Sequence, residues 1–208
     1  MEQVSAVNSP AIKKGRKFDQ VVEGATKVFL RDGFEGASVD DIAREAGVSK
    51  ATLYSYFPDK RILFVEVATH EMRRQADIGA ASLDTSRPPE EVLPLIGHKL
   101  VEYMTSPFGQ AIFRTAVAES SRFPEIGKKF YECGPMQVRE RISDYLRSAI
   151  ERNELKINDI ELAAEQFAEL CKVRSVTCCT FHNDESYDTD HIIAAAVEMF
   201  MARYGVKK

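Results

Sequence analysis

The sequence SVDDIAREAGVSKATLYSYFPDK at residues 38–60 predicts two short helices joined by a tight turn, followed by the start of a third helix. Ser38 can cap the first helix and Ser49 the second, because a serine oxygen accepts a hydrogen bond from the free N–H groups of a helix's first turn. Gly47 supplies the backbone freedom that the turn needs, and Pro58 ends the second helix. This pattern is typical of a helix-turn-helix, whose second helix enters the major groove of DNA.

The composition of the 208-residue chain predicts a folded protein, with 44% hydrophobic and 29% charged residues. This length allows one large domain, or a small domain followed by a larger one. No apolar run approaches the roughly 18 residues of a membrane span, and the N-terminus lacks the apolar segment of a secretory signal. We therefore expect a cytoplasmic protein with no membrane among its partners.

Basic residues gather near the start of the chain, although the net charge of the whole chain is −4. Residues 1–60 contain nine Lys/Arg and nine Asp/Glu, whereas residues 61–208 contain nineteen and twenty-three. One basic cluster has no acidic residue among its members, which are Lys13, Lys14, Arg16 and Lys17. A basic segment ahead of an acidic body suits a protein that touches DNA at one end only.

Apolar residues recur at helical spacing along most of the chain, and no stretch shows the alternation of a β-strand. We therefore predict an all-α protein with an N-terminal three-helix DNA-binding domain, which contains the helix-turn-helix, and a C-terminal helical bundle for ligand binding and dimerisation. The predicted limits are a flexible tail at 1–13, the DNA-binding domain at 14–60 and the bundle at 61–208.

Seven further helices are predicted around and beyond the helix-turn-helix. They span residues 14–32, 59–80, 89–105, 107–121, 123–152, 158–181 and 187–204. Gly33 ends the first of these, and Gly134 with Pro135 can interrupt the helix at 123–152.

Two segments of the chain resemble a known family. GASVDDIAREAGVSKATLYSYFPDKRILF, at residues 36–64, is similar to the DNA-binding domain of TetR-family transcriptional regulators, and the likeness extends over about residues 16–64. FRTAVAESSRFPEIGKKFYECGP, at residues 113–135, is similar to the regulatory domain of the AefR-like subset. The resemblance implies a ligand-responsive repressor without enzymatic activity or cofactor. Its partners would be double-stranded operator DNA, a second copy of the chain and a small-molecule effector that releases the DNA.

The start of the second short helix carries the side chains that we expect to contact bases. Lys50 can donate to guanine, Thr52 can donate or accept, and the methyl group of Ala51 can contact a thymine methyl group. The resemblance adds Tyr54, Tyr56 and Lys60, chiefly as contacts to phosphates. The full set of predicted DNA-binding residues is Lys13, Lys14, Arg16, Lys17, Ser38, Ser49, Lys50, Ala51, Thr52, Tyr54, Tyr56 and Lys60.

A helix-turn-helix also occurs in proteins that bind no DNA, and in that alternative Tyr54 and Tyr56 would only pack against the core. Four other apolar residues of this region are predicted to form a core that fixes the angle between the two short helices. They are Phe29, Ile42, Leu53 and Phe57.

The last two predicted helices are apolar around much of their circumference, which indicates neighbours on two sides. A four-helix bundle made by two subunits would provide these neighbours. Because one recognition helix contacts only a few base pairs, a dimer on a near-palindromic operator would supply the specificity. The predicted interface comprises Leu170, Val173, Ile192, Ile193, Ala196, Val197, Met199 and Phe200. The alternative is a monomer in which the same residues form an internal core.

The helices between residues 81 and 181 are expected to leave room for a small molecule. The candidate ligand-binding residues are Tyr103, Met104, Phe108, Phe113, Arg114, Val117, Phe123, Tyr131, Met136, Phe167, Cys171 and Arg174. For each aromatic residue or methionine, the alternative is that the side chain only packs in the hydrophobic core and contacts no ligand. Arg114 and Arg174, on otherwise apolar helix faces, must either reach solvent or pair with a negative charge, which Glu119, Glu169 or an anionic ligand would supply.

Four cysteines late in the chain leave a metal or redox role open, although small buried thiols are the usual case. Cys178 and His182 would share a helix face if the helix continued, at a spacing that can hold zinc. Adjacent Cys178 and Cys179 point in different directions on a helix, and the chain has no CxxC pair. We therefore predict no metal site.

Two other classes of protein account less well for the sequence. An enzyme is disfavoured because the chain has no nucleophile elbow, no phosphate-binding glycine loop and no HExxH motif. A purely structural helical protein would explain the bundle but not the basic cluster beside a helix-turn-helix.

Overall fold

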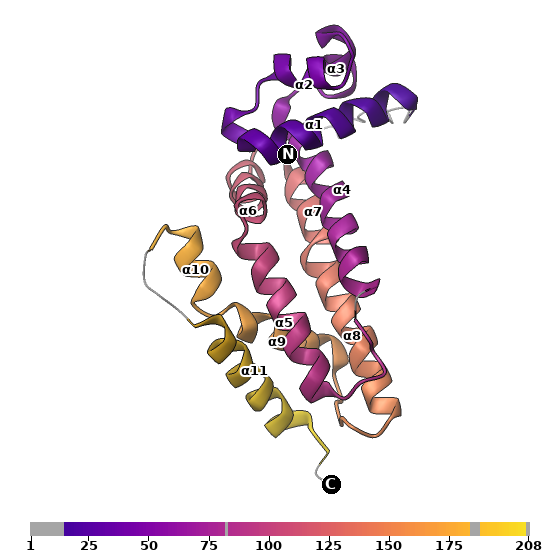
Figure 1. Ribbon diagram of the computed structural model, residues 1–208, viewed down its shortest axis with the longest axis vertical. Helices are drawn as coiled ribbons and strands as arrows, with labels where there is room; N and C mark the ends of the chain where they lie inside the picture. Colours follow the sequence, from indigo (N-terminus) through magenta and orange to yellow (C-terminus); the bar gives the residue numbers. More distant parts are fainter. Residues whose placement is uncertain (1–14, 82, 184–187, 207–208) are drawn as a thin grey trace, which may run out of the picture. The chain divides into compact units, whose positions relative to one another are not determined.

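The computed structural model describes residues 15–81, 83–183 and 188–206, with only the backbone described over 75–81. The described residues form eleven helices (Figure 1). They are α1 (Arg16–Gly36), α2 (Val39–Glu45), α3 (Lys50–Tyr56), α4 (Lys60–Ala81), α5 (Pro89–Thr105), α6 (Pro107–Glu119), α7 (Pro124–Cys133), α8 (Pro135–Glu151), α9 (Ile160–Lys172), α10 (Ser175–Thr180) and α11 (Thr189–Tyr204). The all-α prediction is confirmed.

The chain divides into two compact units, residues 1–67 and 68–208, and the division falls inside α4. The tail predicted at residues 1–13, with Lys13, and the neighbouring Lys14 lie outside the described residues.

In the first unit, α1 packs its apolar face against α2, α3 and the beginning of α4. Phe18 contacts Phe57 at a ring-centroid distance of 5.3 Å, and Phe29 contacts Phe64 at 4.9 Å. Leu53 of α3 is 1% exposed, which places it under the outer face of that helix. The predicted core of Phe29, Ile42, Leu53 and Phe57 is confirmed, since all four are buried.

The predicted caps and turn of the helix-turn-helix are also present. The Ser38 hydroxyl accepts a hydrogen bond from the Asp41 N–H at 3.0 Å, and the Ser49 hydroxyl accepts one from the Thr52 N–H at 3.1 Å. Gly47, between α2 and α3, has a φ of 64°, a left-handed conformation that glycine adopts without steric cost. The two serine caps and the left-handed glycine therefore fix where α2 and α3 begin and how the chain turns between them.

A second glycine sets the distance between α1 and this turn. A Cβ atom on Gly24 would lie 2.6 Å from the backbone nitrogen of Ala46 and 2.8 Å from its Cβ atom. Because part of the obstacle is backbone, no side-chain rotation can relieve the overlap. Gly24 thus allows α1 to approach the end of α2 closely.

In the second unit, α5, α8, α9 and α11 enclose the hydrophobic core (Figure 1). Leu93, Leu146, Phe167 and Ile193 each have an exposed fraction of 1% or less. Gly97 brings α5 close to two neighbours, since a Cβ atom there would lie 3.1 Å from the Cys171 Sγ and 3.0 Å from an Ile193 methyl carbon.

The helix limits follow the predictions with two exceptions. The helix predicted to end at Gly33 continues as α1 to Gly36, although Gly33 interrupts it with a φ of 69°. The interruption predicted at Gly134 and Pro135 is confirmed, because α7 ends at Cys133 and α8 begins at Pro135. The single helix predicted at 158–181 is wrong: α9 ends at Lys172 and α10 begins at Ser175. Arg174 between them has a φ of 66°, which is uncommon for a residue other than glycine. The sequence has no glycine or proline at this break, so the usual signal for the end of a helix is missing.

Replacing Gly24 by alanine should lower the free energy of unfolding of the first unit by about 1–2 kcal/mol. Overpacking against Ala46 costs about 1–3 kcal/mol, which exceeds the gain of about 1 kcal/mol from replacing a helical glycine. Hydrogen exchange of the α1–α3 amides and urea unfolding would measure the change. Gly36→Ala is the control, since its nearest contact would be Asp32 Cβ at 3.4 Å. Equal stability of the two variants would show that Gly24 sets no packing distance.

Candidate functional site

The outer face of α3 is an exposed surface with a chemistry suited to DNA bases. Lys50 and Ala51 are exposed and Thr52 is partly exposed, while Leu53 points into the core. Tyr54 is also exposed, at 48%. A cationic donor, a methyl group and a hydroxyl group therefore lie in sequence at the first turn of the helix, the part that typically meets base edges.

Two contacts hold these side chains in the structure. The Lys50 ammonium group pairs with the Asp40 carboxylate of α2, and both side chains are more than half exposed. Such an exposed ion pair contributes little stability, so Lys50 can exchange it for a nucleic-acid acceptor. The Thr52 hydroxyl lies 2.9 Å from the Ser49 hydroxyl.

Lys60 is held by the protein rather than presented freely. Its Nζ atom donates to the Phe34 carbonyl at 2.8 Å and the Ala37 carbonyl at 3.0 Å, and it lies 4.4 Å from the Phe34 ring centroid. These acceptors belong to the end of α1 and the connection to α2. Lys60 therefore joins the start of α4 to that connection, a role that the sequence did not indicate.

The remaining predicted DNA contacts fall into three groups. Arg16 and Lys17 are exposed at the beginning of α1. Tyr56 is partly buried, with the edge of its ring against Phe18 at a centroid distance of 5.9 Å. The side chains of Ser38 and Ser49 cap helices, as described above.

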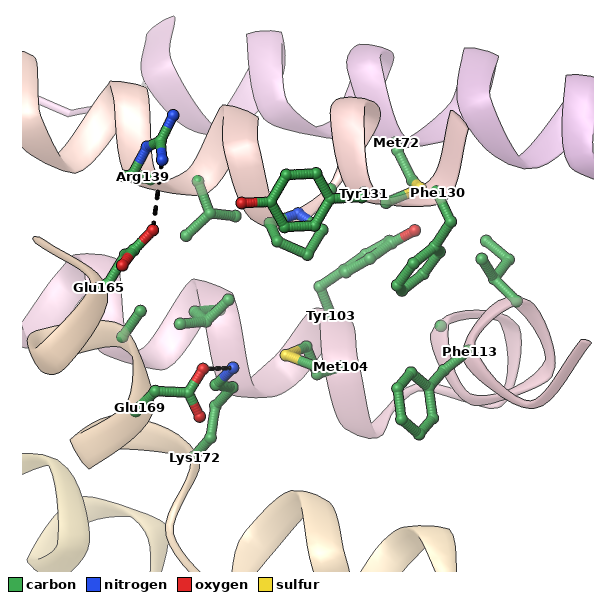
Figure 2. Close-up of a pocket in the computed structure, with 17 residues that line it drawn as sticks. Met72, Tyr103, Met104, Phe113, Phe130, Tyr131, Arg139, Glu165, Glu169 and Lys172 are labelled. Atoms are coloured by element: carbon green, nitrogen blue, oxygen red, sulfur yellow. Dashed lines mark hydrogen bonds and ion pairs between the residues drawn. The ribbon is translucent and has the colours of Figure 1, made fainter. Parts of the chain in front are cut away.

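A cavity of about 300 Å³ lies in the second unit, within the size range of small-molecule sites. Its lining comes from α4, α5, α6, α7, α8 and α9, together with Gly134. Figure 2 shows aromatic and methionine side chains toward one end and two ion pairs toward the other. The aromatic end includes Tyr103, Phe113, Phe130 and Tyr131.

Four of the predicted ligand-binding residues line this cavity, namely Tyr103, Met104, Phe113 and Tyr131. Two others lie elsewhere, because Phe167 and Cys171 are fully buried in the hydrophobic core. Arg114, Val117 and Arg174 are exposed, and Phe108, Phe123 and Met136 are partly buried outside the lining. The sequence analysis missed Met72, Phe130, Arg139 and Lys172.

The Tyr103 hydroxyl is the most unusual polar group of the cavity. It is buried and has no hydrogen-bond partner within the described residues. Burial raises the pKa of Tyr103 well above its usual range, and the nearby Glu71 carboxylate raises it further. Glu71 is itself 4% exposed and accepts two hydrogen bonds from Arg74, at 2.8 and 2.6 Å. The phenol therefore stays protonated at physiological pH.

The predicted dimer interface is divided between core and surface. Ile193, Ala196, Val197 and Phe200 are buried within one subunit, which leaves little of their surface for a second copy, and their place in the interface stays a prediction. They pack on α5 and α9, which the helical pattern of α11 alone does not reveal. Leu170 and Ile192 are partly buried.

Two residues of that predicted set are exposed, Val173 at 56% and Met199 at 59%. Other exposed apolar residues of the same helices and their connection are Leu162 of α9, at 48%, and Phe181 after α10, at 77%. Exposed apolar side chains on α9, α11 and the connections between α9 and α11 therefore remain on the subunit.

Three of the four cysteines, Cys133, Cys171 and Cys178, are buried, and Cys179 is partly buried. Burial raises the pKa of the Cys171 thiol to about 12. The helical spacing considered for Cys178 and His182 does not hold, because α10 ends at Thr180 and His182 has a φ of 51°. Among the residues that the structure describes, no cluster of three His, Cys, Asp or Glu side chains could hold a metal ion.

A helix-turn-helix unit joined to a helical unit with a cavity is the architecture of a ligand-responsive DNA-binding regulator. Residues 21–67 match the DNA-binding region of bacterial regulatory proteins of the tetR family. Residues 91–206 match the C-terminal domain of AefR-like transcriptional repressors. The chain belongs to the TetR family of transcriptional regulators and has an AefR-like C-terminal domain, as its sequence suggested. This is a family of regulators and not of enzymes.

Individual relatives support this assignment. The HTH-type transcriptional regulator YhgD of Bacillus subtilis is 28% identical over 67% of this chain and 66% of its own length. A TetR-family regulator from Mesorhizobium loti has a TM-score of 0.78 and 26% identity, over 92% of this chain and 98% of its own. The flavonoid-responsive regulator FrrA has a TM-score of 0.67 and 29% identity, over 94% of this chain and all of its own (100%). No described helix is long and apolar enough to cross a membrane.

Replacing Lys60 by methionine should destabilise the first unit by about 1–2 kcal/mol in the absence of DNA, because two backbone carbonyls lose a charged donor. Urea unfolding would measure this loss. Lys27→Met is the matched control, since Lys27 pairs only with the exposed carboxylates of Glu23 and Glu45 among its recorded partners and should lose less than about 1 kcal/mol. If the Lys60 variant were as stable as the unchanged protein, the structural role of Lys60 would be excluded and only a contact with DNA would remain.

Proposed function

We propose that this TetR-family regulator is a repressor that binds a near-palindromic operator as a homodimer and leaves it when a small molecule occupies the cavity of the second unit. The observation that carries the proposal is the capped, outward-facing first turn of α3. It presents Lys50, Ala51 and Thr52 while Leu53 anchors the helix from below.

Contacts with bases and with phosphates have different sources in this proposal. Lys50 and Thr52 supply the donors and acceptors that distinguish base pairs in the major groove. Arg16 and Lys17, with Lys13 and Lys14 ahead of them, neutralise flanking phosphates, which makes the affinity fall with salt. Tyr54, Tyr56 and Lys60 are proposed as further backbone contacts. For Lys60 this requires that it give up a carbonyl acceptor.

The homodimer follows from the reach of one recognition helix. A single α3 spans only part of an operator, and two copies of it must enter grooves about 34 Å apart on one face of DNA. The exposed apolar residues Leu162, Val173, Phe181 and Met199 are the surface proposed to join the subunits. Burying such a surface is favourable in proportion to the apolar area removed from water.

Release of DNA is proposed to pass through α4, which runs from Lys60 to Ala81. Met72 of this helix lines the cavity, and a Cβ atom on Gly134 would lie 2.5 Å from its terminal carbon. A ligand that displaces Met72 therefore moves α4 and changes the spacing of the two copies of α3. By linkage, such a ligand must bind the DNA-bound form less tightly than the free form. The relative FrrA is named as flavonoid-responsive, which is compatible with an aromatic effector here.

Replacing Lys50 or Thr52 by alanine should weaken operator binding by about tenfold or more each, because a good base contact contributes roughly 1–3 kcal/mol of discrimination. Footprinting and quantitative gel shifts on the DNA upstream of the protein's own gene would measure both affinity and sequence preference. Lys27→Ala is the charge-matched control, with a side chain exposed at 57% against 55% for Lys50. Unchanged operator preference in the Lys50 and Thr52 variants would contradict the assignment of α3 as the reading helix.

Replacing Met199 by glutamate should convert the dimer to monomers without unfolding them, because it places a charge in an apolar contact between subunits. Analytical ultracentrifugation would detect the change, and the gel shift would show a loss of operator affinity. Val117→Glu is the control, an equally exposed apolar residue on α6 at 61%. If the Met199 variant stayed dimeric, this surface could not be the contact between subunits.

A further inference from the structure

The cavity contains a hydrogen-bond donor that no side chain or backbone group of the described residues uses. The Tyr103 hydroxyl is covered from solvent, and no acceptor among those residues takes its proton. An unpaired buried hydroxyl group lowers stability, typically by about 1–3 kcal/mol. In Figure 2 the Tyr103 ring extends among the lining residues toward Phe130. Its oxygen is covered in this structure, so an acceptor on a bound molecule reaches it when a neighbouring lining side chain moves aside.

The surroundings of Tyr103 specify the charge of that acceptor. The phenol is protonated, because burial and the Glu71 carboxylate both raise its pKa. Arg74 pairs with Glu71, so only part of this negative charge acts at the hydroxyl, and that part disfavours a carboxylate or phosphate there. A neutral oxygen, such as that of a carbonyl group, accepts the hydrogen bond without this repulsion.

The charged end of the cavity leads to the same conclusion. Arg139 pairs with Glu165 at 3.3 Å and with Glu161 at 3.7 Å, and Lys172 pairs with Glu169 (Figure 2). The two cations and two carboxylates that line the cavity therefore compensate one another. The lining therefore offers no net positive charge to an anionic ligand, and the Arg139 Nε–H, which has no partner among the described residues, can donate to a neutral oxygen.

The other end of the cavity is suited to aromatic rings. Phe113 and Phe130 lie 6.1 Å apart between ring centroids, and Tyr131 belongs to the same wall. Met72 and Met104 add flexible, polarisable surface, which packs well on aromatic rings. Aromatic pairs of this kind stabilise a ring inserted among them beyond the effect of burial alone.

We propose that the effector is an uncharged aromatic molecule whose carbonyl-type oxygen accepts a hydrogen bond from the Tyr103 hydroxyl. This inference rests on the proposed function in one respect, namely that the cavity is the effector site. Tyr103 is then the residue that selects an oxygen-bearing ligand over a hydrocarbon of the same shape.

Two probes that differ in a single group test this selection. Benzophenone carries a carbonyl group where diphenylmethane carries a methylene group, and both are uncharged. Isothermal titration calorimetry of the full-length protein, with the protein in the syringe, should give about 3–10-fold tighter binding of benzophenone, the range expected from one hydrogen bond. Tyr103→Phe should abolish this difference while leaving the binding of diphenylmethane unchanged.

Tyr131→Phe is the matched control, because it removes a hydroxyl from the same wall but from an exposed tyrosine. It should retain the preference for benzophenone. Thermal unfolding of each variant checks that the fold is intact, and irradiation of the benzophenone complex followed by peptide mass spectrometry should place the cross-link on cavity residues.

A charged probe and a chain-like probe test the alternatives. 4-Benzoylbenzoate, which adds a carboxylate to benzophenone, should bind at least tenfold more weakly. Tighter binding of this anion, binding of laurate without binding of benzophenone, or a ketone preference that survives in Tyr103→Phe would overturn the proposal. Failure of both uncharged probes to bind would overturn it as well.

The calorimetry contains no DNA, so its outcome is separate from that of the operator assays. If the protein bound its operator but showed no preference for benzophenone, the proposed ligand class would be wrong and the DNA-binding function would stand. Selective binding of benzophenone to a protein that shows no operator preference would support the ligand class and contradict the DNA-binding function.

Discussion

The outward position of α3 depends on the close approach of α1 to the end of α2. A helix of seven residues is too short to be stable alone, so α3 takes its orientation from the surface beneath it. That surface is built by aromatic contacts such as Phe18 with Phe57 and by the absence of a side chain at Gly24. The packing on one side of α3 is therefore what leaves its other side free for DNA.

The second unit uses the same helices for two purposes. α5, α8 and α9 contribute Leu93, Leu146 and Phe167 to a closed core, and further along they supply lining residues of the cavity. A site built on helices that are anchored in a core keeps its donors and rings in place before a ligand arrives. Such preorganisation reduces the entropy lost on binding.

One polar group that weakens the fold lies where ligand binding is proposed. The Tyr103 hydroxyl has no partner among the described residues, whereas the buried Glu71 is paired with Arg74. Replacing Tyr103 by phenylalanine would remove a desolvation penalty, which is consistent with a role for the hydroxyl in the proposed ligand site. Lys60 is different, because its ammonium group satisfies carbonyls that α1 leaves open at its end.

The sequence by itself determined the helices, the caps at Ser38 and Ser49, the turn at Gly47 and the interruption at Gly134, because each depends on the chemistry of a few adjacent residues. Only the tertiary structure decided which apolar residues face a cavity and which fill the core. Tyr103 and Phe167 have the same helical signal, since periodicity identifies the buried face of a helix but not the element that covers it. The break at Arg174, the internal acceptors of Lys60 and the burial of Phe200 within one subunit likewise depend on contacts with residues distant in the chain.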